Sequence, residues 1–182
     1  IIDNSKAQIF VNFFKNNLKK IIILLSLIII FISSYYIFKN YKNKLDLEIS
    51  ENFIVAQNLI NKGNKIEAKK ILLEIINKKH KFYSPSALNL IIDYDLIEDE
   101  NEVIEYFDLI ISMRNLDVEM KNLFIIKKIY FLGNKVDESI LLTNLNPIIQ
   151  SNSIWKQIAQ DYLYKFYLSK NELDKAKEFK IN

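Results

Sequence analysis

The feature that most constrains this chain is a long apolar segment near its N-terminus. Residues 21–38 read IIILLSLIIIFISSYYIF, contain no charged side chain, and are bracketed by Lys19, Lys20 and Lys39. A helix of this length covers roughly 27 Å, close to the thickness of the hydrocarbon core of a bilayer. Aromatic residues, which favour the membrane interface, lie near both ends of the segment. The sequence therefore predicts one transmembrane helix over residues 21–38.

Two alternative interpretations of this segment stay open. A buried core helix of a soluble protein would show a polar face, and this segment has none. A cleaved signal peptide would have a shorter apolar region followed by small residues at a cleavage site. Here Ser33 and Ser34 are the only small residues near the end of the segment, and Tyr35 and Tyr36 follow them directly. A membrane span that is retained in the protein is the favoured interpretation.

Charge is unevenly divided along the chain. The 182 residues carry a net charge of +3, but residues 1–44 hold seven Lys and one acidic residue, which leaves residues 45–182 with a net charge of −3. Lys beside a membrane span contacts lipid phosphates, and a mildly acidic soluble part argues against nucleic acid as a partner. Four Lys precede the span and three follow it, so the positive-inside rule does not decide the orientation.

The remainder of the chain is predicted to be all-α. Only two Gly and two Pro are present, whereas β domains need many turn residues. Apolar residues recur at helical spacing, with Ser84 as an expected cap and Pro147 as an expected stop. The expected helices cover residues 45–62, 65–78, 85–96, 103–112, 117–132, 137–145 and 153–169, with a last helix from residue 172.

These helices are expected to form repeated antiparallel pairs. The turns within pairs fall at Gly63, about Glu98, Gly133 and about Asn171, and this spacing is near the period of about 34 residues that is typical of tetratricopeptide units. Small residues and glycines are expected where the two helices of a pair pack closely, whereas Glu138 and Ser139 occupy that place in the third unit. The expected helix-pair packing residues are Ala56, Gly63, Ala68, Gly133 and Ala176. Generic helical hairpins of similar length are the alternative.

The predicted fold is thus all-α, with an N-terminal transmembrane helix followed by an α-solenoid of degenerate tetratricopeptide-like helix pairs. Residues 1–20 are expected to form an N-terminal arm, 21–38 the span, 39–48 a juxtamembrane helix or linker, and 49–182 the repeat domain. Because the chain begins at Ile1 rather than Met, a few native residues are expected to precede it. Further helix is also expected after Asn182, because the last unit otherwise exposes an apolar face.

The sequence predicts no enzyme. No Cys is present, so thiolate catalysis and Cys-ligated zinc are excluded. His80 lies alone among Lys residues, and the acidic run at 93–102 has Glu98 and Ile104 where a calcium loop starting at Asp93 requires Gly and Glu. No Gly-rich phosphate loop occurs. We therefore expect no catalytic residues, no metal site and no cofactor, and Trp155 is expected to pack in the core.

The order of these segments resembles a known family. NKGNKIEAKKILLEII is similar to the first helix turn of the ancillary Sec-translocon subunit family of bacterial inner membranes, FYSPSALNLIIDYDLI is similar to its second unit, and NPIIQSNSIWKQIAQDYLYKFYLSKNELDKAKEF to its closing unit. The resemblance covers nearly the whole chain. It implies a soluble domain on the periplasmic side of the inner membrane, contact with the Sec translocon and membrane-bound chaperones, and unfolded polypeptides as clients.

A tetratricopeptide-like register also predicts a binding groove. The first helix of each pair would line the concave face at unit positions 2, 5, 9, 12 and 13, with Gly63, Gly133 and Asn171 at position 15. The resulting groove is lightly charged, which suits varied unfolded segments because hydrophobic contact is non-directional. The groove candidates are Phe53, Gln57, Ile60, Met120, Lys127, Tyr130, Asp161 and Lys165. Packing of Phe53, Tyr130 and Phe131 between neighbouring units is an equally open interpretation.

The favoured function is therefore a membrane-tethered, non-enzymatic protein-binding module that assists polypeptides at the Sec translocon. A membrane-anchored tetratricopeptide scaffold for the assembly of another envelope complex is the alternative, since such folds serve many partners. The identity of the client, the oligomeric state and, from charge alone, the orientation in the membrane do not follow from the sequence.

Overall fold

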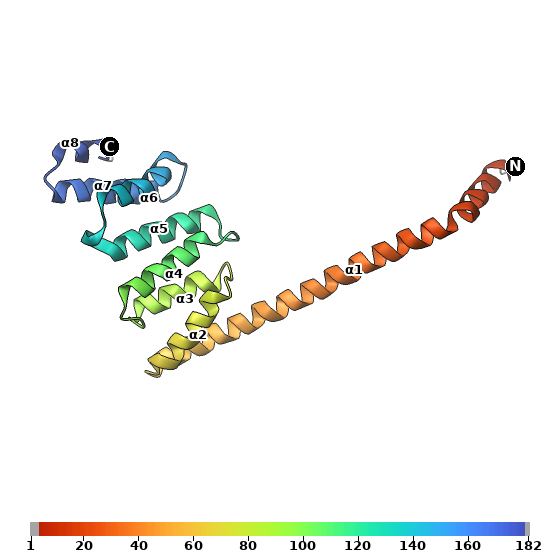
Figure 1. Cartoon of the computed structure of the whole chain (residues 1–182), viewed down its shortest axis with the longest axis horizontal. Coiled ribbons are helices and arrows are strands. Elements are labelled where there is room, and N and C mark those ends of the chain that lie inside the picture. Colours follow the sequence, from red (N-terminus) through yellow and green to blue (C-terminus); the bar gives the residue numbers. More distant parts are fainter. Residues whose placement is uncertain (1–3, 181–182) are drawn as a thin grey trace. The chain divides into compact units, whose positions relative to one another are not determined.

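The computed structural model describes residues 4–180, and all regular structure within them is helical. The prediction of an all-α protein is therefore confirmed. Figure 1 shows the order of the elements. They are α1 (Asn4–Asn61), α2 (Lys65–Asn77), α3 (Tyr83–Asp93), α4 (Glu100–Ser112), α5 (Val118–Leu132), the 3₁₀ turn η1 (Gly133–Lys135), α6 (Glu138–Gln150), α7 (Lys156–Ser169) and α8 (Leu173–Glu178).

The chain divides into two compact units, Ile1–Glu48 and Ile49–Asn182. From Asn4 the first unit consists of helix α1, so residues 4–20 of the predicted arm and the juxtamembrane helix or linker predicted at 39–48 are helical and continuous with the apolar segment. No Gly or Pro interrupts the chain before Gly63, and this absence allows one long helix. Residues 1–3 lie outside the described part.

The apolar segment exposes its side chains in every direction around α1. All residues from Ile22 to Lys44 are exposed, and Phe31 keeps 78% of its surface accessible. Ser26 Oγ donates to the Ile22 carbonyl oxygen at 2.8 Å, which satisfies the hydroxyl inside the helix. Within the described residues, α1 is the one helix that is long and apolar enough to cross a membrane. Exposure all round would be costly in water but suits lipid.

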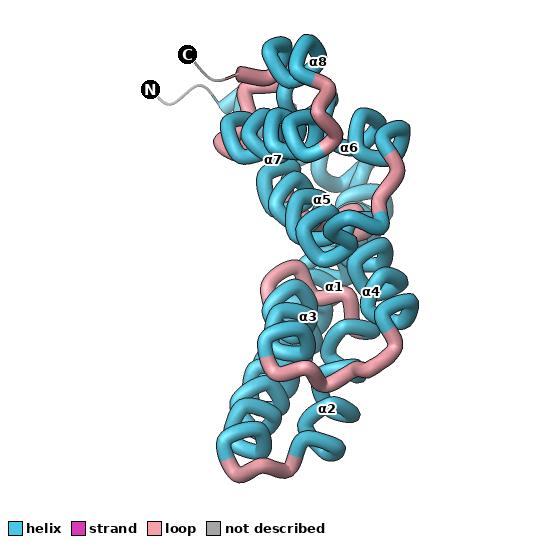
Figure 2. The backbone as a smooth tube through the Cα atoms, turned by 90° about the vertical axis from the view of Figure 1, so that its left-hand side faces the viewer, coloured by secondary structure: helices cyan, strands magenta, loops and turns pink. Residues whose placement is uncertain are grey.

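The second unit is built from residues 49–61 of α1 and helices α2–α8. Each helix from α2 onward packs against the next one in the chain, and Figure 2 shows them succeeding one another from α2 to α8. In Figure 1 the turns within pairs lie along one edge of this unit and the loops that join successive pairs lie along the other. The core follows the helix interfaces. Its largest buried side chains include Leu72, Ile76, Leu88, Phe107, Phe124, Leu141, Leu145 and Tyr167.

Small residues are buried where the register predicts close helix packing. Ala56 on α1, Ala68 on α2 and Ala176 on α8 are all fully buried or nearly so. Trp155 precedes α7 and packs against the core cluster of the last two pairs, although its indole N–H has no hydrogen-bond partner among the described residues. These positions contribute apolar contact area at the helix interfaces.

Three of the turns within pairs have the same backbone conformation. Gly63, Asp95 and Asn171 all have positive φ, at 79°, 49° and 60°. At each turn the residue's N–H and the following N–H return to helix carbonyls, as when Gly63 N donates to Ile60 O and Asn64 N to Leu59 O, both at 2.9 Å. These two hydrogen bonds satisfy carbonyl groups at the end of the helix. The second turn was expected near Glu98, but the positive φ at Asp95 ends α3 at Asp93, earlier than the predicted Leu96.

The turn within the third pair has a different backbone conformation, and the helix after it differs from the sequence prediction. Gly133 has φ 55° and ψ −129°, the conformation of the first central residue of a type II′ turn, and it begins the 3₁₀ turn. Helix α6 was expected to stop before Pro147, but it continues to Gln150. The prediction was wrong because Leu145 and Ile148, on either side of Pro147, are both buried. Their packing offsets the one helix hydrogen bond that Pro cannot donate.

The loop between α2 and α3 is closed by a serine hydroxyl. Ser84 was expected to cap α3, but the helix begins at Tyr83, and His80 Nδ1 accepts from Phe82 N at 3.2 Å and from Tyr83 N at 3.1 Å. Instead Ser84 Oγ accepts from His80 N and donates to Ile75 O, both at 2.8 Å. The buried hydroxyl therefore links the end of α2 to the start of α3. Aspartate caps occur on later helices, where Asp99 accepts from Asn101 N and Asp117 from Met120 N, both at 2.9 Å.

Candidate functional site

The candidate binding face is formed by the first helix of each pair. These helices are the end of α1, then α3, α5 and α7, and their side chains line three hollows. Six of the predicted groove residues were placed on α1 and α5, and two on α7. Five of these eight residues line the hollows: Gln57, Ile60, Lys127, Tyr130 and Lys165.

The first hollow lies between α1 and α3. It has a volume of about 270 Å³ and is lined by Gln57, Asn58, Ile60, Asn61, Leu90 and Tyr94. Gln57, Asn58 and Asn61 are exposed, whereas Ile60 keeps only 7% of its surface accessible. The hollow therefore presents carboxamide groups at its surface and an apolar side chain beneath them.

The second hollow lies between α3 and α5, with one residue from α4. It has a volume of about 300 Å³ and is lined by Asn89, Ile92, Asp93, Phe107, Lys127, Tyr130 and Phe131. The Phe107 and Phe131 ring centroids are 5.8 Å apart. Lys127 Nζ donates to Asn89 Oδ1 at 2.7 Å and lies 5.6 Å from the centroid of the Phe124 ring. Lys127 thus braces α5 against α3 rather than projecting as an unpartnered cation.

The third hollow lies between α5 and α7 and shares Tyr130 with the second. It has a volume of about 230 Å³ and is lined by Tyr130, Asn134, Tyr162, Lys165, Phe166 and Ser169. The Tyr130 ring meets the Tyr162 ring edge to face at 4.9 Å, and Tyr130 is 53% exposed. Burial, followed by the nearby Tyr130, raises the pKa of Tyr162 above its ordinary value. Tyr130 is the side chain that joins the two hollows.

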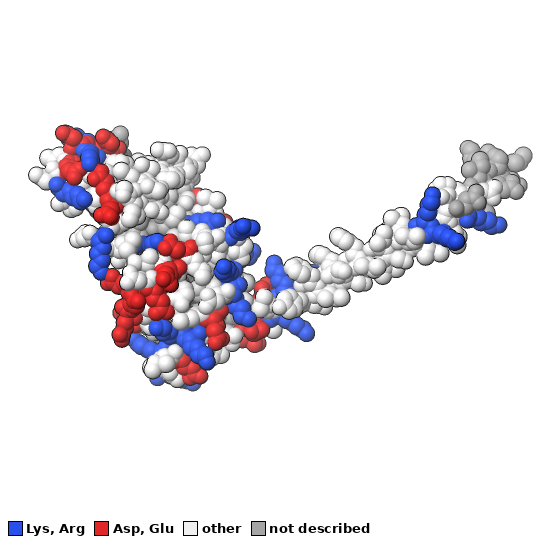
Figure 3. Space-filling view, in the orientation of Figure 1, with Lys and Arg blue, Asp and Glu red and all other residues white. Residues whose placement is uncertain are grey.

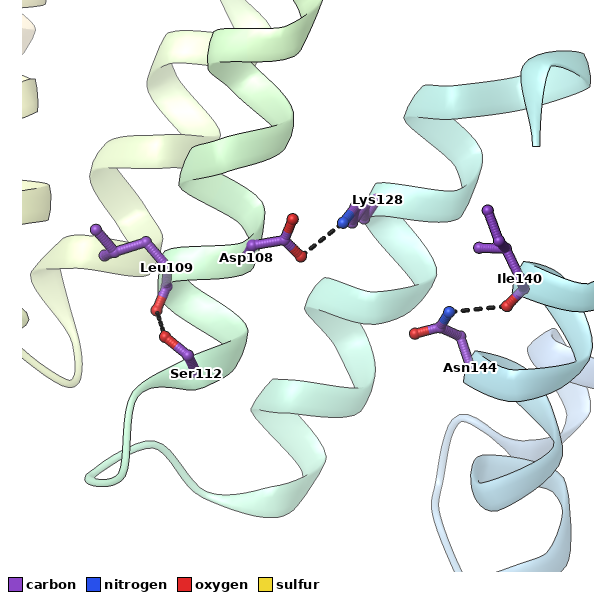
Figure 4. Close-up of polar contacts among 6 residues, drawn as sticks. All are labelled: Asp108, Leu109, Ser112, Lys128, Ile140 and Asn144. Carbon is purple, nitrogen blue, oxygen red and sulfur yellow. Dashed lines mark hydrogen bonds and ion pairs between the residues drawn. The ribbon is translucent and has the colours of Figure 1, made fainter. Parts of the chain in front are cut away.

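One ion pair and one hydrogen bond engage the two lysines that line these hollows. Lys165 Nζ lies 2.7 Å from Asp161 Oδ2, and the hydrogen bond to Asp161 raises the pKa of Lys165. On the α4 side of α5, Lys128 Nζ lies 2.6 Å from Asp108 Oδ1, as Figure 4 shows. The face is therefore nearly neutral, with aromatic and carboxamide groups as its main exposed chemistry.

Figure 4 also shows how polar side chains on the neighbouring helices are satisfied. Ser112 Oγ donates to Leu109 O, and Asn144 Nδ2 donates to Ile140 O, both at 2.8 Å. Both bonds stay within one helix, so these groups add no contact between helices. They offer less unsatisfied polar surface than the carboxamides on the candidate face.

Three predicted groove residues line none of these hollows. Phe53 is half-buried, with its ring centroid 5.5 Å from that of Tyr83, whose hydroxyl donates to Ser50 Oγ at 2.8 Å. Met120 is half-buried in the first turn of α5, and Asp161 is the partner of Lys165. Phe53 therefore packs between α1 and α3.

The sequence-based register missed the contribution of the second pair. Asn89, Ile92 and Asp93 line the second hollow. They were not predicted because this pair has no Gly to mark its turn. With Asp95 at position 15, the same register assigns Asn89 to position 9, Ile92 to position 12 and Asp93 to position 13. The signal was present in the sequence, but an Asp in a positive-φ turn cannot be told from a solvated acidic run by residue type alone.

Among the residues that the structure describes, no group of three His, Asp or Glu side chains is placed to hold a metal ion. The three hollows are lined by Lys, Tyr, Asp and Ser side chains among carboxamide and apolar groups. Comparison of the chain with family models, with curated proteins and with solved structures gave no match.

Proposed function

We propose that this chain is a single-pass membrane protein whose residues 49–182 form a degenerate tetratricopeptide-like α-solenoid that binds polypeptide without catalysis. The observation that carries the proposal is the row of three hollows on the first helices of successive pairs. Adjacent hollows that follow the repeat suit an extended chain better than a compact ligand, because an extended chain meets successive units in turn.

The chemistry of the face supports polypeptide as the ligand. A carboxamide both donates and accepts hydrogen bonds, so Gln57, Asn61 and Asn134 match the N–H and C=O groups of a peptide main chain whatever its sequence. Tyr130 and Phe131 offer aromatic surface to apolar side chains. Because the lysines are engaged within the fold, the face lacks the dense cationic clamp that a fixed acidic tail would require.

The membrane span supports a role close to a membrane machine. Of the 18 residues from 21 to 38, 13 are Ile, Leu or Phe, and at roughly −0.5 kcal/mol each near the centre of a bilayer they favour insertion by roughly 6 kcal/mol. Tethering raises the effective concentration of the binding face at the bilayer. Together with the family resemblance, this supports our proposal that the partners are the Sec translocon of the bacterial inner membrane, membrane-bound chaperones and unfolded clients, and that the soluble unit lies on the periplasmic side.

The second candidate is a membrane-anchored scaffold for the assembly of another envelope complex. This second candidate is favoured by the ion pairs along the helices, because they make the surface of the unit rigid. Affinity purification of the full chain after mild detergent extraction separates the two candidates. Translocon subunits in the eluate support the first function, and a different envelope complex in their place supports the second.

A variant pair tests the binding face itself. Tyr130→Ser should weaken binding of a permanently unfolded polypeptide by the full chain in lipid nanodiscs, because Tyr130 serves two hollows. Ile66→Ser is the matched control, since Ile66 is a strongly exposed apolar side chain on the second helix of a pair. Both variants should keep the helical circular dichroism of the parent. Equal loss of binding in both, or unchanged binding with Tyr130→Ser, would rule out this face.

A further inference from the structure

We propose that the loops joining successive helix pairs form a docking edge for the anionic lipid surface of a bilayer. This inference rests on the membrane span in the proposed function. It concerns the loops at 78–82 and 113–117 and the first residue of α5. The side chains that carry it are Lys79, Lys81, Phe82, Arg114 and Val118.

The two edges of the Ile49–Asn182 unit differ in charge. The loops that join pairs, at 78–82, 113–117 and 151–155, carry a net charge of +3, whereas the turns within pairs, at 62–64, 94–99, 133–137 and 170–172, carry −2. Figure 3 shows Lys and Arg side chains along the loop edge, and acidic side chains with some Lys among them along the other. The field of such a charge distribution orients the unit so that its loop edge faces an anionic membrane surface.

Three cations of the loop edge form no ion pair within the described residues. Lys79, Lys81 and Arg114 are exposed, and within residues 4–180 none of them forms an ion pair with a carboxylate. Many lysines elsewhere do form such pairs, as Lys128 does with Asp108 and Lys175 with Glu138. Unpaired cations on one edge remain available to lipid phosphates.

The two loops are held together and enclose a cationic hollow. Asn115 Nδ2 donates to Lys79 O at 3.0 Å, which ties the second loop to the first. Lys79, Met113 and Arg114 line a hollow of about 380 Å³ together with Ser112 and Asn115. Two cationic side chains at the rim of one hollow offer a phosphate group more than one donor.

Exposed apolar side chains accompany these cations. Phe82 is 63% exposed and packs edge to face on Tyr83, with ring centroids 5.1 Å apart, while Val118 is 69% exposed at the start of α5. Apolar and aromatic groups beside cations are the composition of surfaces that lie in the headgroup region of a membrane. A soluble acidic protein would match the charges but would not require Phe82 to remain exposed.

The position of the membrane span in the chain favours a bilayer as the partner that binds this loop edge. The unit begins at Ile49, and the hydrogen bond from Tyr83 Oη to Ser50 Oγ places that beginning beside the start of α3 and the 78–82 loop. Only ten residues, 39–48, separate it from the apolar segment. Whatever their conformation, they span at most about 35 Å. The chain therefore enters this unit at the edge that carries the unpaired cations.

The test uses the full chain reconstituted into lipid vesicles. The chain has no Cys, so Val118→Cys gives a single site for an environment-sensitive fluorophore on the loop edge, and Glu98→Cys gives one on the other. Vesicles of phosphatidylcholine are compared with vesicles that also contain phosphatidylglycerol, both with acyl-chain quenchers. We expect quenching at position 118 in the anionic vesicles, its loss in 1 M salt because the Debye length shortens, and no quenching at position 98.

Charge reversal provides the matched control. The triple variant Lys79→Glu, Lys81→Glu, Arg114→Glu should lose the quenching at position 118, and Phe82→Asn should reduce it. Reversal of Lys62, Lys135 and Lys170 to Glu changes the net charge equally on the other edge and should leave the quenching intact. Equal quenching in neutral and anionic vesicles, or an unaffected loop variant, overturns the docking edge. If the chain fails to float with the vesicles in alkaline carbonate, the membrane span fails as well.

Discussion

The phenol of Tyr167 on α7 donates a 2.9 Å hydrogen bond to Oε1 of Glu138 on α6. Lys175 on α8 donates to the same oxygen at 2.8 Å, and the Phe179 ring stacks on Tyr167 with a centroid distance of 5.7 Å. The hydrogen bond from Lys175, followed by that from Tyr167, lowers the pKa of Glu138. One carboxylate therefore links α6, α7 and α8 near the C-terminal end of the helical unit. The predicted repeat pattern called for a small residue at this position.

Tyr167 makes the stability of this region fall as the pH rises in the alkaline range. Burial and the hydrogen bond to Glu138 raise its pKa from 10.0 to about 12. Its folded pKa lies above its unfolded value, so its stabilisation is complete below pH 10 and is lost as the pH rises through about 12. Tyr167→Phe should lower the free energy of unfolding by about 1 kcal/mol at pH 7. Urea unfolding followed by Trp155 fluorescence should show a smaller loss of stability between pH 10 and 12 in this variant.

Tyr164→Phe on the same helix is the control for that measurement, because it leaves the Tyr167–Glu138 hydrogen bond intact and should keep the alkaline profile of the parent. An alkaline profile of Tyr167→Phe that matches the parent would contradict the role of the Tyr167–Glu138 bond.

The two glycines should respond differently to the same substitution. Gly63 occupies the turn conformation that Asp95 and Asn171 adopt in other pairs, so Gly63→Asn should cost less than about 1 kcal/mol. Gly133, with φ 55° and ψ −129°, occupies a conformation that side chains rarely adopt, so Gly133→Asn should cost about 1–3 kcal/mol. A Cβ at either position would meet no atom within 4 Å, so the difference comes from the backbone alone. Equal unfolding midpoints in urea would refute this assignment.

Ala68 tests the packing of the first pair. It is fully buried on α2, as is Ala56 on α1. Ala68→Leu should overpack this contact and cost about 1–3 kcal/mol. Lys70→Leu on the exposed side of the same helix is the control and should leave the unfolding midpoint nearly unchanged. If both variants unfold at the same urea concentration as the parent, the register of the repeat is wrong.

Topology can be measured at an exposed position near the end of α7. Ser169→Cys introduces the only thiol of the chain, and position 169 is exposed. With the soluble unit on the periplasmic side, a membrane-impermeant maleimide should label this Cys in intact spheroplasts. Labelling only after lysis would place the unit in the cytoplasm. Charge alone does not decide the matter, because Lys residues flank the apolar segment on both sides.

Local patterns predicted the helices and most of their boundaries. Helical periodicity places Ala68, Leu72 and Ile75 on the buried face of one helix, and Gly63 marks the turn before it, because both signals depend on neighbouring residues only. Five of the eight groove candidates line hollows for the same reason, since the register follows from the turn positions.

The remaining features depend on contacts between distant residues. Pro147 stays within α6 because Leu145 and Ile148 are buried against other helices. Ser84 bonds to Ile75 rather than capping α3, because the folded loop brings that carbonyl close. The sequence predicted Lys127 as a cation in the groove, but its ammonium group donates a hydrogen bond to Asn89 of the preceding pair. None of these partners is within helical reach in the sequence, so tertiary packing decided each outcome.

The most direct test of the central claim is site-specific photo-crosslinking in intact membranes. A photoreactive amino acid replaces Tyr130, which joins two hollows on the candidate face, or Ile66, which is exposed on a second helix. An arrested secretory polypeptide is held in the Sec translocon during irradiation. A membrane-tethered polypeptide-binding face predicts an adduct between the arrested polypeptide and position 130, with none at position 66. No adduct at position 130, or equal adducts at both positions, would contradict it.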